Sequence, residues 1–501
     1  MTIQPSLNSF SRERALFHFR RLSLNALLQI GSQVLPLVAG AIAIPIVYRN
    51  IGRVEFGIFT IALSALGLFA LLDLGLGRAA VRFMARAFAE NDLPEAASVA
   101  VHSGLLLGGF SLTLTIALAV TIPIIVNHWF HFTAYEQNLL RQSLYILSVA
   151  LPFAGLTSVF RAVLEARESF LTISIIQGAL GVLTYSVPML LSFATADVRV
   201  IIGGAIACRV LAFAAFTTAA ARAWQGPFPW HRVNLAGQRD FRRFSLWLVI
   251  SNVVGSAIVY GDRALLVKLF GLAEVPYYNI PLEMLGRLMI VVNSAATVIF
   301  PSLSRASENK MLFEEVYVTL TTILSVVVGV VLLGMSIGTP LGLQLWLGNE
   351  FRDHSTGVVR ILFIGLAFQS LNVFALASLN ARGFARPITF MHLIEAPAYL
   401  WALYRFGLHS GLVGVASVWS SRLIFEYACF AGFQAAIGGK GGRPKLAFGA
   451  LVAGCNMIPL AVIAVTGDKL LALSASGVFA TLSIVWSLSL LRKDRLHATA
   501  Q

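Results

Sequence analysis

The stretch LTTILSVVVGVVLLGMSIG, residues 320–338, decides the class of this protein because it contains no charged side chain. Residues 104–126 and 171–193 are uncharged runs of the same kind. A helix of about 20 apolar residues crosses the hydrocarbon core of a bilayer, whereas the strands of a membrane barrel show short alternating segments. These runs therefore predict membrane-spanning helices.

The composition of the whole chain agrees with this class. Apolar residues make up 57% of the 501, and charged residues make up 12%, about half the share found in soluble domains. The net charge of +14 is carried mainly by arginines in short loops between apolar runs, without a continuous basic face. Positive loops of this kind set the orientation of membrane proteins, so we expect no nucleic-acid partner.

Hydropathy predicts an all-α integral membrane protein with about fourteen transmembrane helices. Most of the Lys and Arg residues fall on one side of the membrane if the N-terminus is cytoplasmic, and an even number of spans returns the C-terminus to that side. The predicted spans are residues 22–48, 57–79, 98–126, 138–160, 171–193, 199–223, 243–269, 276–300, 315–338, 356–380, 387–405, 411–433, 446–466 and 471–491.

A weak internal repeat divides the predicted spans. The segment IGRVE at 51–55 recurs as FGLAE at 270–274, and at the same offset Arg86 matches Arg305. Six helices in each copy predict two lobes of equal orientation, related by a pseudo-two-fold axis along the membrane normal. The predicted organisation is a cytoplasmic arm at 1–21, an N-lobe of helices 1–6 at 22–223, a cytoplasmic linker at 224–242, a C-lobe of helices 7–12 at 243–433, two further helices at 446–491 and a cytoplasmic tail at 492–501.

Several short motifs resemble those of a known transporter family. The stretches GRVEFGIF at 52–59 and LLDLGLGR at 71–78 look like the opening of the polysaccharide transporter family, the Wzx-type O-antigen and exopolysaccharide flippases of the multidrug/oligosaccharidyl-lipid/polysaccharide (MOP) exporter superfamily. The second half agrees through GDR at 261–263, YYNI at 277–280, PSLS at 301–304, LNARG at 379–383 and GLVGVA at 411–416. The resemblance covers roughly residues 20–435.

The resemblance implies a two-lobed fold around a central cavity in the bacterial inner membrane. It implies a flippase that moves undecaprenyl-diphosphate-linked oligosaccharide from the cytoplasmic to the periplasmic leaflet by alternating access, for surface polysaccharide synthesis. Lipid-linked oligosaccharide and membrane lipids are then its expected partners, with a polysaccharide polymerase and glycosyltransferases as candidates. An ion-coupled multidrug exporter and a peptidoglycan lipid-precursor flippase of the same superfamily are the alternatives.

The cargo's diphosphate would need compensating cations while it crosses the membrane. Arginine suits this task because its planar fork binds phosphate bidentately and stays charged. The arginines that lie away from span ends are Arg209, Arg263, Arg287 and Arg422, and we predict that they line a cationic cavity. The competing interpretation is that they hold helices together by pairing with neighbouring carboxylates.

Carboxylates at membrane depth are also uncommon and usually face a cavity or a partner. Asp73, Asp262, Glu283, Glu395 and Glu426 are candidates for proton or sodium coupling or for ion pairing. The i,i+4 spacing predicts two pairs along single helices, Glu283 with Arg287 and Arg422 with Glu426. Asp262 and Arg263 are adjacent, about 100° apart on a helix, and are expected to meet different neighbours.

The remaining sequence features are the arginines expected on the cytoplasmic side and the motifs that would indicate an enzyme. Arg78, Arg82 and Arg161 are candidates for capturing an anionic lipid at the cavity entrance, although setting the topology also explains them. We find no phosphate-cradling Gly-Lys-Ser/Thr loop, zinc-protease helix or nucleophile elbow. The sequence therefore predicts a protein that is not an enzyme and that has no metal or organic cofactor.

Overall fold

The computed structural model describes residues 31–71, 76–129, 132–224, 226–234, 262–263, 265–306, 310–381, 385–437 and 439–498. Contacts within the chain divide it into two compact units, Met1–Tyr260 and Gly261–Gln501. The predicted linker at 224–242 lies mostly outside the described residues, so the predicted lobe boundaries and the two-fold relation between the lobes stay predictions.

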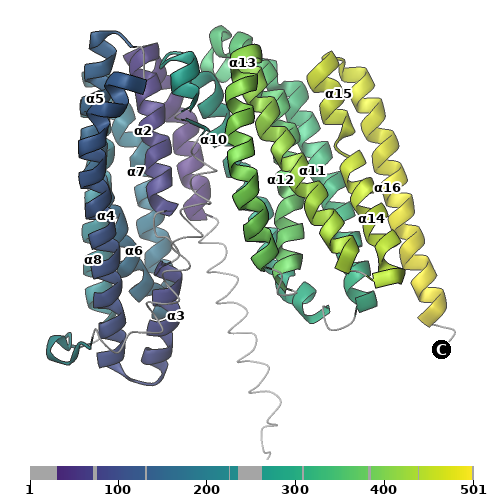
Figure 1. The fold of residues 1–501 in the computed structure, drawn as a ribbon, viewed down its shortest axis with the longest axis horizontal. Helices are drawn as coiled ribbons and strands as arrows, with labels where there is room; N and C mark the ends of the chain where they lie inside the picture. The colour runs from purple at the N-terminus through teal and green to yellow at the C-terminus, as the bar shows by residue number, and fades with distance from the viewer. Residues whose placement is uncertain are drawn as a thin grey trace, which may run out of the picture. The chain divides into compact units, whose positions relative to one another are not determined.

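Unit 1 is a bundle of helices. Helices α4, α6, α7 and α8 run side by side in it, and α3 packs on α4 and α6 (Figure 1). Its elements are a helix at Gly31–Ile51, α2 at Arg53–Leu71, α3 at Leu76–Ala89, α4 at Leu93–Trp129, α5 at Ala134–Ser148, α6 at Ala150–Ala166, α7 at Phe170–Ala194, α8 at Val198–Ala223 and the short 3-10 helix η1 at Trp230–Arg232.

Unit 2 is organised around α12, which packs against α10, α11, α13 and α15 (Figure 1). In the most apolar 18-residue stretch of α12, 61% of the residues are buried, whereas in the corresponding stretch of α4 the share is 17%. The elements of unit 2 are α10 at Pro276–Ala306, α11 at Lys310–Leu347, α12 at Asn349–Ala381, α13 at Ala385–Ile437, α14 at Gly439–Cys455, α15 at Ile458–Thr466 and α16 at Lys469–Ala498.

Glycines in the left-handed region explain two equivalent helix starts. Gly52 has a φ of 87° and immediately precedes α2, while Gly271 has a φ of 79° and lies shortly before α10. Only glycine adopts this conformation without a steric penalty. These two glycines are matched by the sequence repeat, and the aromatic residues that it also matches, Phe59 and Tyr278, are both buried. The repeat is therefore present in the local structure of both units.

The prediction of an all-α membrane protein is confirmed. Among the described residues, eight helices are long and apolar enough to cross a membrane. The span predicted at 171–193 matches α7 closely, and the one predicted at 57–79 covers parts of α2 and α3, with residues 72–75 outside the described part of the chain. The spans predicted at 387–405 and 411–433 correspond to the two helical segments of α13, which meet at a kink at Gly411.

Candidate functional site

The charged groups of unit 2 gather on α13 because this element turns back on itself. Its backbone departs from helical geometry at Gly411, with φ 60° and ψ −148°. The turn is tight, since a Cβ on Gly414 would lie 2.4 Å from the carbonyl oxygen of Phe406. The two segments of α13 therefore approach each other, and residues far apart along the helix become neighbours.

Four side chains form what we call the α13 cluster: His392, Glu395, Arg422 and Glu426. Glu395 lies between two partners, with its Oε2 at 3.2 Å from His392 Nδ1 and its Oε1 at 4.0 Å from Arg422 Nε. The other nitrogen of His392, Nε2, lies 3.9 Å from Glu426 Oε1. Glu395 is 7% exposed and Glu426 is 8% exposed. Buried carboxylates are costly unless they are paired, and this arrangement supplies the partners.

Asp262 and Arg263 extend this group of charges. The Asp262 side chain is buried, and Arg263 Nη1 lies 3.4 Å from its Oδ1. Asp262 also interacts electrostatically with Arg422, whose guanidinium carbon lies 5.1 Å from the ring centroid of Tyr399. Asp262 and Arg263 thus also contact each other, because the long Arg263 side chain reaches back to the Asp262 carboxylate.

A groove of about 600 Å³ runs along the α13 cluster. Glu395, Tyr399 and Arg422 contribute to its wall. Its rim includes two large apolar side chains that are mostly exposed, Ile394 at 67% and Phe425 at 57%. Pockets of a few hundred Å³ with apolar walls and a few convergent polar groups are typical binding sites. The groove therefore offers charged groups at the floor of an otherwise apolar surface.

The pairing within the α13 cluster differs from the sequence prediction. An i,i+4 pair between Arg422 and Glu426 was expected, but the carboxylate within ion-pair distance of Arg422 is that of Glu395, and Glu426 is near His392 instead. The turn at Gly411 brings a closer partner from the other segment, which local spacing along one helix does not reveal. His392 was missed, although its position three residues before Glu395 placed it on the same helix face.

Arg209 has a different environment in unit 1. It lies on α8, and its Nη2 donates a hydrogen bond of 2.9 Å to the carbonyl oxygen of Leu66. Its Nε is buried with no hydrogen-bond partner, and no carboxylate within ion-pair distance is found among the described residues. Arg209 therefore holds a positive charge inside a helical bundle that the described side chains leave uncompensated.

The other predicted site residues are placed as follows. Arg287 and Glu283 are half-buried on α10. Arg82 is exposed on α3, and Arg161 forms an ion pair of 2.6 Å with Glu165 on α6. Asp73 and the side chain of Arg78 lie outside the described residues. The structure thus brings Arg263 and Arg422 together within unit 2, while the roles predicted for all these residues stay predictions.

The fold and the family now define the class of this protein. It is a multi-pass membrane protein with the fold of the MOP superfamily of transporters. One solved structure with this fold is the lipid II flippase MurJ in an inward closed conformation, with a TM-score of 0.65, 17% identity and 94% of this chain and 99% of that chain covered. Another is the inward-facing conformation of a multidrug resistance MATE family transporter, with a TM-score of 0.64, 14% identity and 82% and 99% covered.

The sequence comparisons narrow this class to one family. Residues 22–307 match the family described as polysaccharide biosynthesis protein, and the chain belongs to it. A curated relative from Shigella flexneri, named "Putative O-antigen transporter", is 24% identical over 409 residues, which cover 80% of this chain and 95% of the relative. The predicted resemblance to polysaccharide transporters is confirmed.

Proposed function

We propose that this protein is a flippase that moves undecaprenyl-diphosphate-linked oligosaccharide from the cytoplasmic to the periplasmic leaflet of the bacterial inner membrane. In this proposal both termini are cytoplasmic, transport follows alternating access, and a polymerase and glycosyltransferases of surface polysaccharide synthesis are its functional partners. Membership of the polysaccharide biosynthesis family and the similarity to a relative named as an O-antigen transporter support this choice.

The single observation that carries the proposal is the environment of Arg209. A guanidinium at membrane depth costs about 2.5–3.5 kcal/mol even on lenient insertion scales. The described residues offset this cost with one backbone carbonyl and no carboxylate. A diphosphate cargo would supply the missing negative charge through charge-assisted hydrogen bonds, which are about twice as strong as neutral ones. An uncompensated arginine therefore favours an anionic cargo over a cationic drug.

The arginines of unit 2 have a second role in the proposal. Arg263 and Arg422 stand beside Asp262 and Glu395, so their charges are available to a cargo only if those contacts open. Buried carboxylates next to a histidine are candidates for binding a coupling proton or sodium ion. We assign this coupling to Glu395 and Glu426, with Asp73, Asp262 and Glu283 as further candidates, and keep Arg287 among the cargo-binding arginines.

The experiment replaces Arg209 by Gln and by Lys. Cells that lack their own O-antigen flippase would express each variant, and delivery of lipid-linked glycan to the periplasmic face would be measured at equal protein abundance. Loss of a charge-assisted contact worth about 1.5–3 kcal/mol predicts an about 10- to 100-fold slower delivery for Arg209→Gln. Arg209→Lys keeps the positive charge but lacks the planar guanidinium that binds phosphate bidentately. Its delivery rate should therefore lie between those of the wild type and Arg209→Gln.

The matched control is Arg199→Gln on the same helix, because Arg199 is already bound by Asp197 at 2.6 Å. This variant should deliver glycan at the wild-type rate. Delivery by Arg209→Gln at the wild-type rate would refute the role of Arg209. Growth rescue of cells depleted of their lipid II flippase, or drug efflux without glycan delivery, would instead favour one of the two alternative functions.

A further inference from the structure

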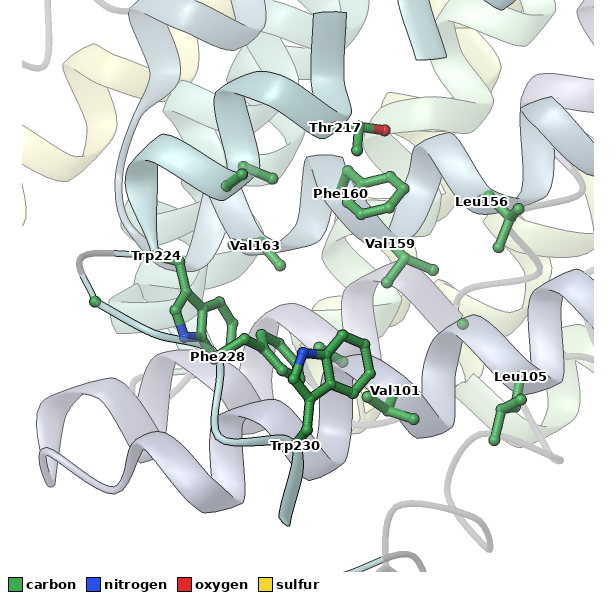
Figure 2. Close-up of a pocket in the computed structure, with 15 residues that line it drawn as sticks. Val101, Leu105, Leu156, Val159, Phe160, Val163, Thr217, Trp224, Phe228 and Trp230 are labelled. Atoms are coloured by element: carbon green, nitrogen blue, oxygen red, sulfur yellow. The ribbon is translucent and has the colours of Figure 1, made fainter. Parts of the chain in front are cut away.

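Unit 1 contains a second pocket, which is separate from the groove of unit 2 and almost entirely apolar. It has a volume of about 560 Å³ and lies where α4, α6 and α8 meet the segment that follows α8 (Figure 2). Val159 of α6 and Ala220 of α8 are buried in its wall, while Leu105 of α4 is 59% exposed at its rim. The pocket therefore opens from the interior of the bundle toward its outer surface.

Three aromatic side chains close one side of this pocket. The rings of Trp224 and Phe228 are 4.8 Å apart between centroids, and those of Phe228 and Trp230 are 4.4 Å apart (Figure 2). The segment that carries them is fixed to α4, since the backbone N–H of Asn234 donates to Ser98 Oγ at 2.9 Å. Trp230 is 70% exposed, and tryptophans of this kind concentrate at the interface between membrane and water.

The indole of Trp224 provides an unused polar group in this wall. The side chain is 4% exposed, and its Nε1 donor has no hydrogen-bond acceptor among the described residues. A buried donor without an acceptor costs about 1–3 kcal/mol.

Three arginines lie in or next to the segments that line this pocket. Arg167 lies over the Phe88 ring at 3.8 Å and donates to the carbonyl oxygen of Trp224 at 3.1 Å. Arg222 follows the lining residue Ala221, and Arg232 follows Trp230 by two positions; both are exposed. Within the described part of the chain, no carboxylate forms an ion pair with any of these three arginines.

We propose that this pocket holds one hydrocarbon chain of an anionic phospholipid such as phosphatidylglycerol, with the headgroup phosphate near Arg222 and Arg232. The apolar wall suits the hydrocarbon chain of the lipid, and the positive charge of the exposed arginines suits its negative headgroup. The pocket lies at one end of the unit 1 bundle, behind a segment fixed to Ser98. It is therefore a stationary lipid site rather than part of a path across the membrane, and it does not depend on the proposed cargo.

The test uses two glycines of α4 that differ in position. Gly104 lines the pocket, whereas Gly109 is exposed elsewhere on the helix, and a Cβ at either position would have no neighbour within 4 Å. Gly104→Phe would fill the pocket with a ring, and Gly109→Phe is the matched control. The full chain would be purified in detergent, and lipid binding would be followed by native mass spectrometry and by the unfolding temperature upon adding phosphatidylglycerol, phosphatidylethanolamine or polyprenyl phosphate.

The expected result is that phosphatidylglycerol binds to and stabilises the wild type and Gly109→Phe but not Gly104→Phe. Arg222→Gln and Arg232→Gln should each weaken the affinity for phosphatidylglycerol by about fivefold, because one arginine near an anionic lipid surface contributes about 1 kcal/mol. Equal binding by both glycine variants would overturn the proposal. So would equal stabilisation by phosphatidylethanolamine, or stabilisation by polyprenyl phosphate alone.

Discussion

Removing Glu395 alone should harm the protein more than removing Glu395 and Arg422 together. The two side chains are 4.0 Å apart and both are largely shielded from water. At this separation two unit charges attract by about 4 kcal/mol at an effective dielectric constant of about 20. Removing one partner of a buried ion pair typically costs about 3–5 kcal/mol, although His392 still lies beside Glu395 and Asp262 still interacts with Arg422. Loss of both side chains removes the attraction and also avoids burying one charge without its closest opposite charge.

The experiment is a double-mutant cycle with Glu395→Gln, Arg422→Gln and the double variant. The free energy of unfolding would be measured in detergent by thermal or denaturant unfolding, together with abundance in the membrane. We expect the double variant to be about 2 kcal/mol more stable than the sum of the two single changes predicts. The exposed pair Arg86 and Glu90, at 2.9 Å, is the control, and its removal should cause no measurable change because solvent screens it.

Additive effects of the two single changes would refute this reasoning and show that Arg422 is not compensated by Glu395. Glycan delivery then separates structure from transport. If Arg422 only pairs with Glu395, the double variant should recover delivery along with stability. If Arg422 also contacts cargo, the double variant should be stable but slow.

Two further predictions concern packing in unit 2. Asn456 donates to Ser325 Oγ at 2.8 Å and accepts from Ser483 Oγ at 2.9 Å. Each such hydrogen bond in a membrane contributes about 0.6–1.7 kcal/mol. Asn456→Ala should therefore lower the free energy of unfolding by about 1–3 kcal/mol. An unchanged unfolding temperature would contradict this. A Cβ on Gly365 would lie 2.4 Å from the Trp419 ring, so Gly365→Ala should cost about 1–3 kcal/mol. On the same helix, a Cβ on Gly357 would have its nearest contact at 3.7 Å, so Gly357→Ala should not lower the unfolding temperature, since alanine favours the helix over glycine.

Hydropathy located most helices because the apolar runs are long and their ends carry charge or turn residues. The span predicted at 171–193 agrees with α7 at Phe170–Ala194 for this reason. The span predicted at 57–79 instead takes in parts of two helices with different environments, α2 and α3. Helix α3 carries Arg82 and Arg86, which are exposed, so its sequence is amphipathic and hydropathy averaged over a window does not separate it from α2.

The partners of the charged residues were harder to predict than the helices. Spacing along one helix identified Arg422 and Glu426 as neighbours, but Arg422 lies near Glu395, which is 27 positions away in the sequence. This contact depends on the left-handed turn at Gly411 and on the close approach at Gly414. Neither feature follows from periodicity, because periodicity describes one helix at a time. Sequence reasoning therefore selected members of the cluster without identifying their pairing.

The two units handle buried arginine in opposite ways. In unit 2, Arg263 and Arg422 each lie within ion-pair distance of a carboxylate, Asp262 at 3.4 Å and Glu395 at 4.0 Å. In unit 1, Arg209 donates to the carbonyl oxygen of Leu66, and no described carboxylate lies within ion-pair distance of it. Because uncompensated charge at membrane depth costs several kcal/mol, a bundle that retains it must gain something in another state of its cycle. Under the proposed function, an anionic cargo that passes Arg209 would supply that gain, whereas a cargo without negative charge would not.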